Sequence, residues 1–299
     1  MKTQQSLDNV LVDQDHPLII GPDPNHPLDP VARNYGTVTV NSGGQVTCKC
    51  TVTMNVDQWV QNANTDSPTI LIVGKDGADG AKGEDAANAS PDGKNGKNGS
   101  ALFKCRSATK GEDGKNADPG QPGGPGGPGD PASNLILRCN QLVGQPVIVL
   151  SQGGRGGRGG DGGKGGNGGN GGNAGAQPRA CAKLDPMPGG VGGKGGDGGP
   201  GGPGGPGGKG GDVTITYVHS EVSIPFRPTS KGGDGGDGGV GQGGKGGLGG
   251  LNGARPGETP THAPNGPDGK PTVGPKGAGG GGGAVSVKQV SSEDNPLWT

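Results

Sequence analysis

Glycine recurs at every third position through long tracts of this sequence, and no other feature constrains the possible folds as strongly. Two of every three residues are glycine from Gly153 to Gly172 and from Gly189 to Gly211, and a further tract from Gly232 to Gly253 keeps one glycine register throughout. A flexible linker does not require glycine at a fixed three-residue spacing. The spacing therefore predicts extended left-handed helices of the polyglycine-II type, whose glycine faces pack closely and exchange peptide hydrogen bonds.

Two other interpretations of the glycine compete with this one. A disordered glycine linker has the same composition but needs no fixed phase. A collagen triple helix would suit Gly74–Glu84, which has one glycine in three, but that run stops at Ala86 and Ala87, and GG-x triplets with few prolines dominate elsewhere. We therefore expect a bundle of glycine helices within one chain.

The remaining composition argues against several classes of protein. The 299 residues include 75 glycines and 28 prolines, while hydrophobic residues make up 26% and aromatic residues 2%. So few apolar side chains do not build the core of a conventional enzyme domain, because glycine-rich backbone is costly to order. We find no nucleophile or metal-ligand motif and expect a non-enzymatic protein without cofactor or metal. With no long apolar run and a net charge of −1, neither membrane insertion nor nucleic-acid binding is expected.

Short segments between the glycine tracts have the character of β-strands. From Gln45 to Asp57 apolar and polar residues alternate, which predicts a half-buried strand. Ile70–Val73 is a second strand and runs directly into Gly74, as an extended strand can continue into an extended helix without reversal. The other predicted strands are Ala101–Cys105, Leu135–Cys139, Val147–Leu150, Val213–Val218 and Ala284–Val287.

The predicted fold class is mainly non-regular and β. It consists of a bundle of extended polyglycine-II helices with short β-strands or solenoid-like rungs and almost no α-helix. We divide the chain into an extended proline-rich arm (1–35), a β-rich module (36–73), the glycine-helix bundle with its strands and loops (74–283), and a terminal strand and tail (284–299).

The five cysteines do not suggest a full disulfide framework, because their number is odd and the N-terminus has no apolar secretory segment. Cys48 and Cys50 share one face with apolar neighbours, and Cys105 and Cys139 also share parity with apolar residues, so all four are interpreted as small buried hydrophobes. Cys181 lies in a predicted loop and is the cysteine expected to react most readily.

Binding is expected in the breaks between glycine tracts, because loops on a rigid frame carry function disproportionately. The segment Ser220–Lys231 is the richest of these breaks, although its phenylalanine could instead cover one end of the bundle. The candidate binding residues are Tyr217, His219, Phe226 and Arg227. Candidate assembly arms are Asp13–Pro30, with His16 and His26, and Ser291–Thr299, with Leu297 and Trp298, unless these are simply loose ends.

The GG-x tracts resemble those of two known families. They are similar to the glycine-rich motifs of the adhesins at the tips of T-even-type phage long tail fibres. That resemblance implies a lattice of glycine helices whose loops recognise a bacterial surface protein. They also look like the antifreeze proteins of the snow-flea type, which would imply a flat ice-binding face.

Taken together, these features predict a non-enzymatic structural or adhesion protein. A stiff glycine-helix scaffold would present recognition loops on a virion or an extracellular surface, without a recognisable secretory signal. Its partners would be proteins, either neighbouring subunits in an oligomer or a cell-surface receptor. One alternative is a self-assembling filament subunit that uses a terminal arm to join its neighbours. A second alternative is an ice-binding protein.

Overall fold

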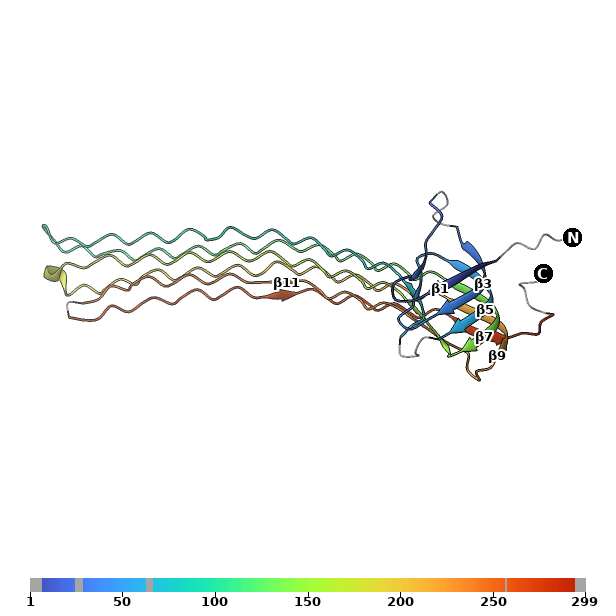
Figure 1. Cartoon of the computed structure of the whole chain (residues 1–299). Coiled ribbons are helices and arrows are strands. Elements are labelled where there is room, and N and C mark those ends of the chain that lie inside the picture. The colour runs from blue at the N-terminus through green and yellow to red at the C-terminus, as the bar shows by residue number, and fades with distance from the viewer. Residues whose placement is uncertain (1–6, 25–28, 63–66, 256, 294–299) are drawn as a thin grey trace.

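The computed structural model describes residues 7–24, 29–62, 67–255 and 257–293. Its regular secondary structure is almost entirely parallel β-sheet (Figure 1). The six-stranded sheet has the order β1 (Asp8–Val12), β3 (Val31–Val40), β5 (Val52–Gln61), β7 (Leu135–Gly144), β9 (Val213–Ser220) and β13 (Val285–Gln289). The five-stranded sheet has the order β10 (Phe226–Lys231), β8 (Val147–Gln152), β6 (Ile70–Val73), β4 (Val46–Cys48) and β2 (Leu18–Ile20).

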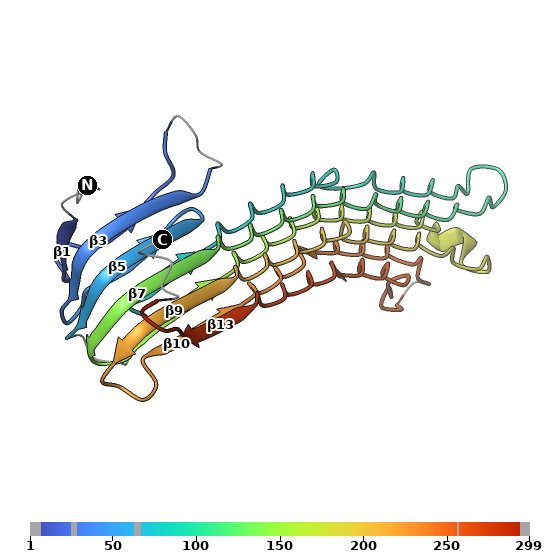
Figure 2. The same ribbon diagram turned by 90° about the vertical axis from the view of Figure 1, so that its right-hand side faces the viewer.

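The chain alternates between these two sheets as it proceeds. From β1 to β10, each strand of the six-stranded sheet is followed by a strand of the five-stranded sheet. All pairs within both sheets are parallel, so successive passes of the chain stack on one another in the same direction. Figure 2 shows the six-stranded sheet facing the viewer, with β1, β3, β5, β7, β9 and β13 side by side in that order.

The hydrophobic core lies between the sheets because the strands alternate in burial. Met54, Leu137 and Ile215 occupy paired positions on neighbouring strands, and all three are fully buried. The core also contains a short polar chain whose hydrogen bonds are satisfied. The indole of Trp59 donates to Gln61 Oε1 at 2.9 Å, and the Gln61 amide donates to the Thr69 hydroxyl at 3.1 Å.

The predicted fold class is wrong. We expected a bundle of polyglycine-II helices carrying short strands or rungs, whereas the structure is built on two parallel sheets of six and five strands. Apart from the short antiparallel pair of β11 (Val240–Gly241) and β12 (Thr272–Val273), the glycine tracts are extended connections assigned neither helix nor strand. The apolar side chains are few, but they concentrate on the inward positions of the strands, and their burial determines the fold.

Two of the predicted strands also need correction. The alternating segment Gln45–Asp57 is divided between β4 and β5, which belong to opposite sheets, although its inward residues stay buried throughout. Ala101–Cys105 forms no strand and lies exposed in a loop. In both cases the local alternation was visible in sequence, but the place where the chain turns was not.

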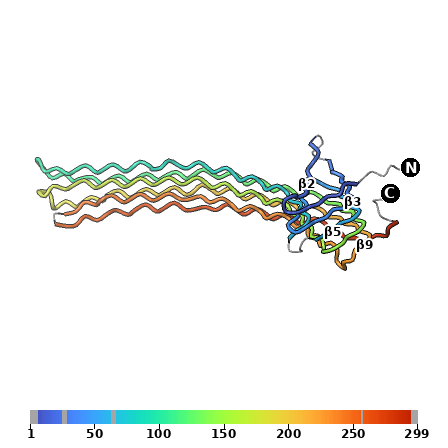
Figure 3. The backbone as a smooth tube through the Cα atoms, in the orientation of Figure 1, coloured from blue at the N-terminus to red at the C-terminus, as the bar shows by residue number. Residues whose placement is uncertain are grey.

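Three glycine-rich excursions leave the sheets and return to them. They connect β6 to β7, β8 to β9, and β10 to β13. The outgoing segments are 74–99, 153–176 and 232–254, and the returning segments are 106–134, 188–212 and 261–284. They lie side by side in a narrow projection, here called the shaft (Figures 1 and 3). At the ~3.1 Å per residue typical of extended chains with a three-residue repeat, segment 74–99 spans about 80 Å.

The shaft is held together by backbone hydrogen bonds between segments. The amide of Gly77 donates to the Arg155 carbonyl at 2.8 Å, and three residues later Gly80 donates to Arg158, also at 2.8 Å. Bonds of the same kind join each outgoing segment to its returning neighbours, as Gly157 does with 106–134. A buried peptide group must find a partner, and here the partner lies on another segment of the shaft.

The number of glycines per triplet follows the number of neighbouring segments. Segment 153–176 is bonded on several sides, and a Cβ added to Gly156 or Gly157 would overlap a carbonyl oxygen of another segment. Segment 74–99 lies at an edge of the shaft, and apart from the bond from Gly74 to Gln152 at the end of β8 its described backbone bonds go to 106–134 and 153–176. One glycine per triplet is enough there, which accounts for the collagen-like spacing of its sequence without a triple helix.

Candidate functional site

Many outward-facing backbone amides of the shaft donate to a side chain on the corresponding segment of the preceding excursion. The Asp76 carboxylate accepts a hydrogen bond from the Arg155 amide at 2.7 Å, and the Asn170 side-chain oxygen accepts one from the Leu248 amide at 2.9 Å. These partners lie 79 and 78 residues apart in sequence. Such caps form a ladder along the shaft and satisfy donors that the glycine backbones do not reach. Aspartate and asparagine therefore have a structural role in the triplets.

Hydrogen bonds of the ladder lower the pKa of some of its carboxyl groups. The amide of Lys164 and then the ammonium of Lys82 lower the pKa of Asp85 below its usual value. In the same way, the amide of Lys270 is the main cause of the lowered pKa of Asp197. A hydrogen bond donated to the charged form of a carboxyl favours that form.

Proline replaces the ladder on part of the returning segments. The carbonyl of Pro200 accepts the Gly123 amide at 2.9 Å, and the carbonyl of Pro275 accepts the Gly204 amide at 2.9 Å. Because proline has no N–H, these positions leave no outward donor to be capped. The exposed prolines of the returning segments include Pro122, Pro125, Pro128, Pro188, Pro200, Pro203, Pro206, Pro264, Pro267 and Pro275.

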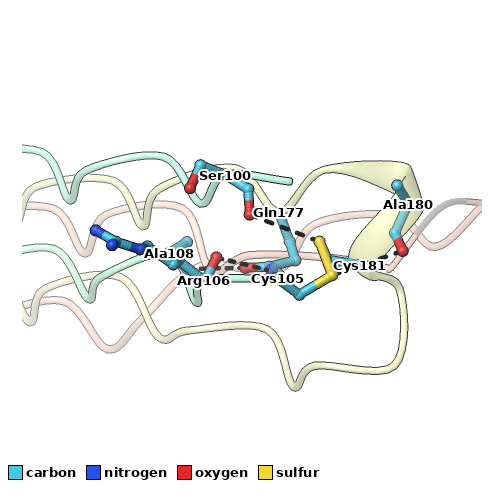
Figure 4. The surroundings of a disulfide bond; sticks show 7 residues. All are labelled: Ser100, Cys105, Arg106, Ala108, Gln177, Ala180 and Cys181. Atoms are coloured by element: carbon cyan, nitrogen blue, oxygen red, sulfur yellow. Dashed lines mark hydrogen bonds between the residues drawn. A yellow bond between two sulfur atoms is a disulfide. The ribbon is translucent and has the colours of Figure 1, made fainter. Parts of the chain in front are cut away.

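The far end of the shaft is formed by the turns that join outgoing to returning segments, and we call it the tip. The turn 100–105 and the turn 177–187 are linked by a disulfide between Cys105 and Cys181 (Figure 4). The second turn contains the 3₁₀ helix η1 (Arg179–Cys181), and the remaining turn is 255–260, in which residue 256 lies outside the described part. The tip therefore presents loops on a frame that is bonded along its whole length.

The disulfide corrects two expectations about the cysteines. Cys105 was expected to be a buried hydrophobe, and Cys181 a reactive thiol; instead the two are bonded to each other, 76 residues apart. The prediction that Cys105 is buried assumed a strand in which it shares a face with apolar residues, but the segment around it is a loop. The three remaining cysteines, Cys48, Cys50 and Cys139, are buried as predicted. Burial raises the pKa of Cys48 and of Cys139 to about 12.

The predicted binding residues near β9 and β10 lie at different depths. Phe226 is only 3% exposed, and its ring lies 5.7 Å from that of Tyr217, so it packs in the core. His219 and Arg227 are exposed on β9 and β10. The structure thus brings Tyr217 and Phe226 together but gives Phe226 no surface through which to bind a partner.

The predicted assembly arms are only partly described. His16 is exposed and lies 2.9 Å from the Asp13 carboxylate, in the turn between β1 and β2. Both of these strands fall within the predicted arm 1–35, and each is paired into a sheet. His26, Leu297 and Trp298 lie outside the described residues.

Sequence reasoning missed Leu102 and Phe103, which are 88% and 103% exposed in the tip turn 100–105. The apolar residues of this segment predict a buried strand, because apolar residues are usually buried. Lys104, within the same turn, is exposed, and so is Arg106 immediately after it. The signal that could have identified this turn is the glycine phase, which stops at Gly99 and resumes at Gly111.

Within the described part of the chain, no cluster of three or more His, Cys, Asp or Glu side chains is placed to hold a metal ion. The described residues also include no helix with the length and hydropathy needed to span a bilayer.

Comparison with known proteins identifies no family for this chain. No protein-family model and no curated protein matches it. Among solved structures, a springtail antifreeze protein from Granisotoma rainieri, described as a bundle of nine polyproline type II helices, aligns at 24% identity over 67% of this chain and 99% of that protein. The TM-score is 0.11, so this similarity supports no inference about fold or function.

Proposed function

We propose that the chain is a non-catalytic spacer and adhesion protein. In this proposal the two-sheet end is attached to a virion or cell surface, the shaft sets a distance of about 80 Å, and the tip recognises another surface. The observation that carries the proposal is the separation of these parts. Both described ends of the chain, at β1 and β13, lie at the sheets, while the tip loops lie at the opposite end of the shaft (Figure 1).

The bonding of the shaft supports this role, because a spacer transmits position only if it is stiff. In the interior segment 153–176 two of every three amides are bonded to the backbone of neighbouring segments, and the turns of two excursions are covalently joined by Cys105 and Cys181. Structural disulfides persist in oxidising surroundings, which favours a location outside the cytoplasm. Loops supported in this way are well suited to binding.

Growth into a filament by stacking of sheet edges is disfavoured by the edge strands. At one edge β1 and β2 are short, and the pairing of β1 with β3 shifts register near Asp8. At the other edge β10 contains Pro228, which has no amide to donate, together with Arg227 and Lys231, and the exposed strand β13 is five residues long and carries Lys288. Short strands, irregular pairing, proline and positive charge are features that protect sheet edges from pairing with another copy. We therefore favour a discrete protein over a filament that grows by stacking of sheet edges.

A cell-binding assay tests the adhesion proposal. The protein is coupled through its N-terminus to fluorescent beads and offered to a panel of Gram-negative, Gram-positive and animal cells. We expect binding to at least one cell type, and loss of that binding when the turn 100–105 is replaced by glycine and serine at its non-cysteine positions. A matched variant, Arg227→Ala at the sheet end, should bind normally. The proposal fails if no cell in the panel is bound, or if altering the tip leaves binding unchanged.

A further inference from the structure

The turn 100–105 places two large apolar side chains in solvent at the tip. Leu102 and Phe103 are 88% and 103% exposed and adjacent in sequence, and they are the two most exposed of the large hydrophobic residues described. Residues of this kind are normally withdrawn from water, and each one buried on binding strengthens an interaction by about tenfold or more. Two adjacent side chains of this kind, exposed at the end of the shaft, indicate a binding surface on a partner that buries them both.

The turn is fixed so that these side chains stay outside. Ser100 and Arg106 exchange two backbone hydrogen bonds of 3.1 and 2.9 Å at its base, and the amide of Ala108 donates to Gln177 Oε1 at 2.8 Å (Figure 4). The disulfide from Cys105 ties the turn to the neighbouring one. Because its base is held at each of these points, the turn cannot easily fold back to bury its apolar residues against the shaft.

Positively charged residues share the two linked turns with the apolar pair. Four exposed cations have no carboxylate partner among the described residues; they are Lys104, Arg179 and Lys183 in the tip turns and Arg106 at the base of the turn 100–105. The nearby acids are already engaged by Arg255, whose guanidinium lies 3.0 Å from Asp185 and whose amide donates to Glu258 at 3.0 Å. The tip thus has an excess of positive charge on a chain whose net charge is −1.

We propose that the tip binds an anionic lipid surface. Leu102 and Phe103 enter the boundary between headgroups and acyl chains, and the four cations face the lipid phosphates and carboxylates. The cations are spread over two turns and the base of one of them, which suits a diffuse anionic surface better than one pocket of a protein. This is a peripheral contact made by a loop. It rests on the proposed function, in which the tip is the recognition end.

Vesicle co-sedimentation tests the lipid contact directly. The full chain is mixed with vesicles of phosphatidylcholine containing about 40% phosphatidylserine, and with vesicles of phosphatidylcholine alone. We expect binding to the anionic vesicles that weakens as salt is raised, and binding to neutral vesicles at least about tenfold weaker. Leu102→Ser with Phe103→Ser should weaken binding about tenfold or more. Lys104→Gln with Lys183→Gln should weaken it and reduce its dependence on salt.

A matched control lies at the other end of the molecule. Ile224 is 58% exposed in the turn between β9 and β10, so Ile224→Ser removes a comparable apolar residue and should not change vesicle binding. Absence of binding to anionic vesicles, or equal binding by the double serine variant, overturns the lipid proposal. Tip-dependent binding to cells without binding to vesicles would do the same, while leaving the adhesion function intact. Vesicle binding without any cell binding would instead contradict the adhesion function.

Discussion

The Asp85 carboxylate accepts a 2.8 Å hydrogen bond from the backbone amide of Lys164, a residue 79 positions later in the chain. This pair shows how successive excursions are joined at the surface of the shaft. In this contact a side chain of the first excursion completes the hydrogen bonding of the second, and neither partner is glycine. The non-glycine positions of the triplets are therefore part of the architecture and not only a soluble exterior.

The ladder carboxylates should make the shaft sensitive to acid. The folded-state pKa of Asp85 lies below its ordinary 3.8, so the unfolded chain takes up the proton first as pH falls. The stabilisation from this contact is complete above about pH 4 and is lost as pH falls through the lowered pKa. We expect the hydrogen-exchange protection factor of the Lys164 amide to fall below pH 4. The Leu248 amide, bonded to the uncharged Asn170, should keep its protection and serves as the internal control.

Close packing of the glycine backbones should make some alanine substitutions severe. A Cβ at position 157 would overlap the carbonyl oxygen of Ala78, so Gly157→Ala should lower stability by about 1–3 kcal/mol or more through overpacking. Gly281 has no atom within 4 Å of an added Cβ, and Gly281→Ala should be neutral or slightly stabilising. Thermal unfolding of both variants gives the comparison. Equal melting temperatures would contradict the packing described for the shaft.

The two phenylalanines should respond in opposite ways to substitution. Phe226 is buried in the core, so Phe226→Ala is expected to cost about 3–5 kcal/mol in the free energy of unfolding. Phe103 is fully exposed, and Phe103→Ala should leave stability within about 0.5 kcal/mol of the parent. Denaturant unfolding of the two variants checks this. A destabilised Phe103 variant would show that the tip turn packs against the shaft.

Loss of the disulfide should loosen the tip. In the chain-entropy description, a link between residues 76 apart stabilises by roughly 4 kcal/mol. We expect Cys105→Ser with Cys181→Ser to lower the melting temperature and to raise amide exchange in the turns 100–105 and 177–187. The sheets should keep their protection, and the amides of β7 provide the comparison. An unchanged melting temperature in non-reducing buffer would argue against the bond.

The three free thiols should be inert in the native protein. Burial raises the pKa of Cys48 and of Cys139 to about 12, and it also raises that of Cys50. Since the thiolate is the reactive form, iodoacetamide at pH 8 should modify none of them in the folded state. In denaturant without reductant three cysteines should be alkylated, and all five after reduction. Mass spectrometry of the intact protein counts the alkylated cysteines, which should number none in the folded protein, three in denaturant and five after reduction.

The strands were largely predictable, because the apolar alternation that defines them is local. Ile70–Val73 coincides with β6, and the segments starting at Leu135, Val147 and Val213 each begin a strand. Their pairing was not predictable from periods of two or three residues. Leu135 pairs with Val213 across an entire excursion, and such long-range parallel pairing leaves no short-range pattern.

A longer repeat in the sequence does record that pairing. Pro122, Pro125 and Pro128 recur 78 positions later as Pro200, Pro203 and Pro206, the same offset that separates Leu135 from Val213. The three-residue period dominates the sequence and hides this offset. The tip was missed for a different reason: exposure of Leu102 and Phe103 goes against the usual burial of apolar residues, and only the turn geometry reveals it.

Each excursion starts where one sheet strand ends and finishes where another begins, so its length is independent of the core. One additional GG-x triplet in every outgoing and returning segment would move the loops about 9 Å further out without changing a single strand. The distance between the sheets and the tip is thus set by the number of tripeptides in each segment. The same sheets could carry longer or shorter versions of the protein, each with its turns displaced by a whole number of such steps.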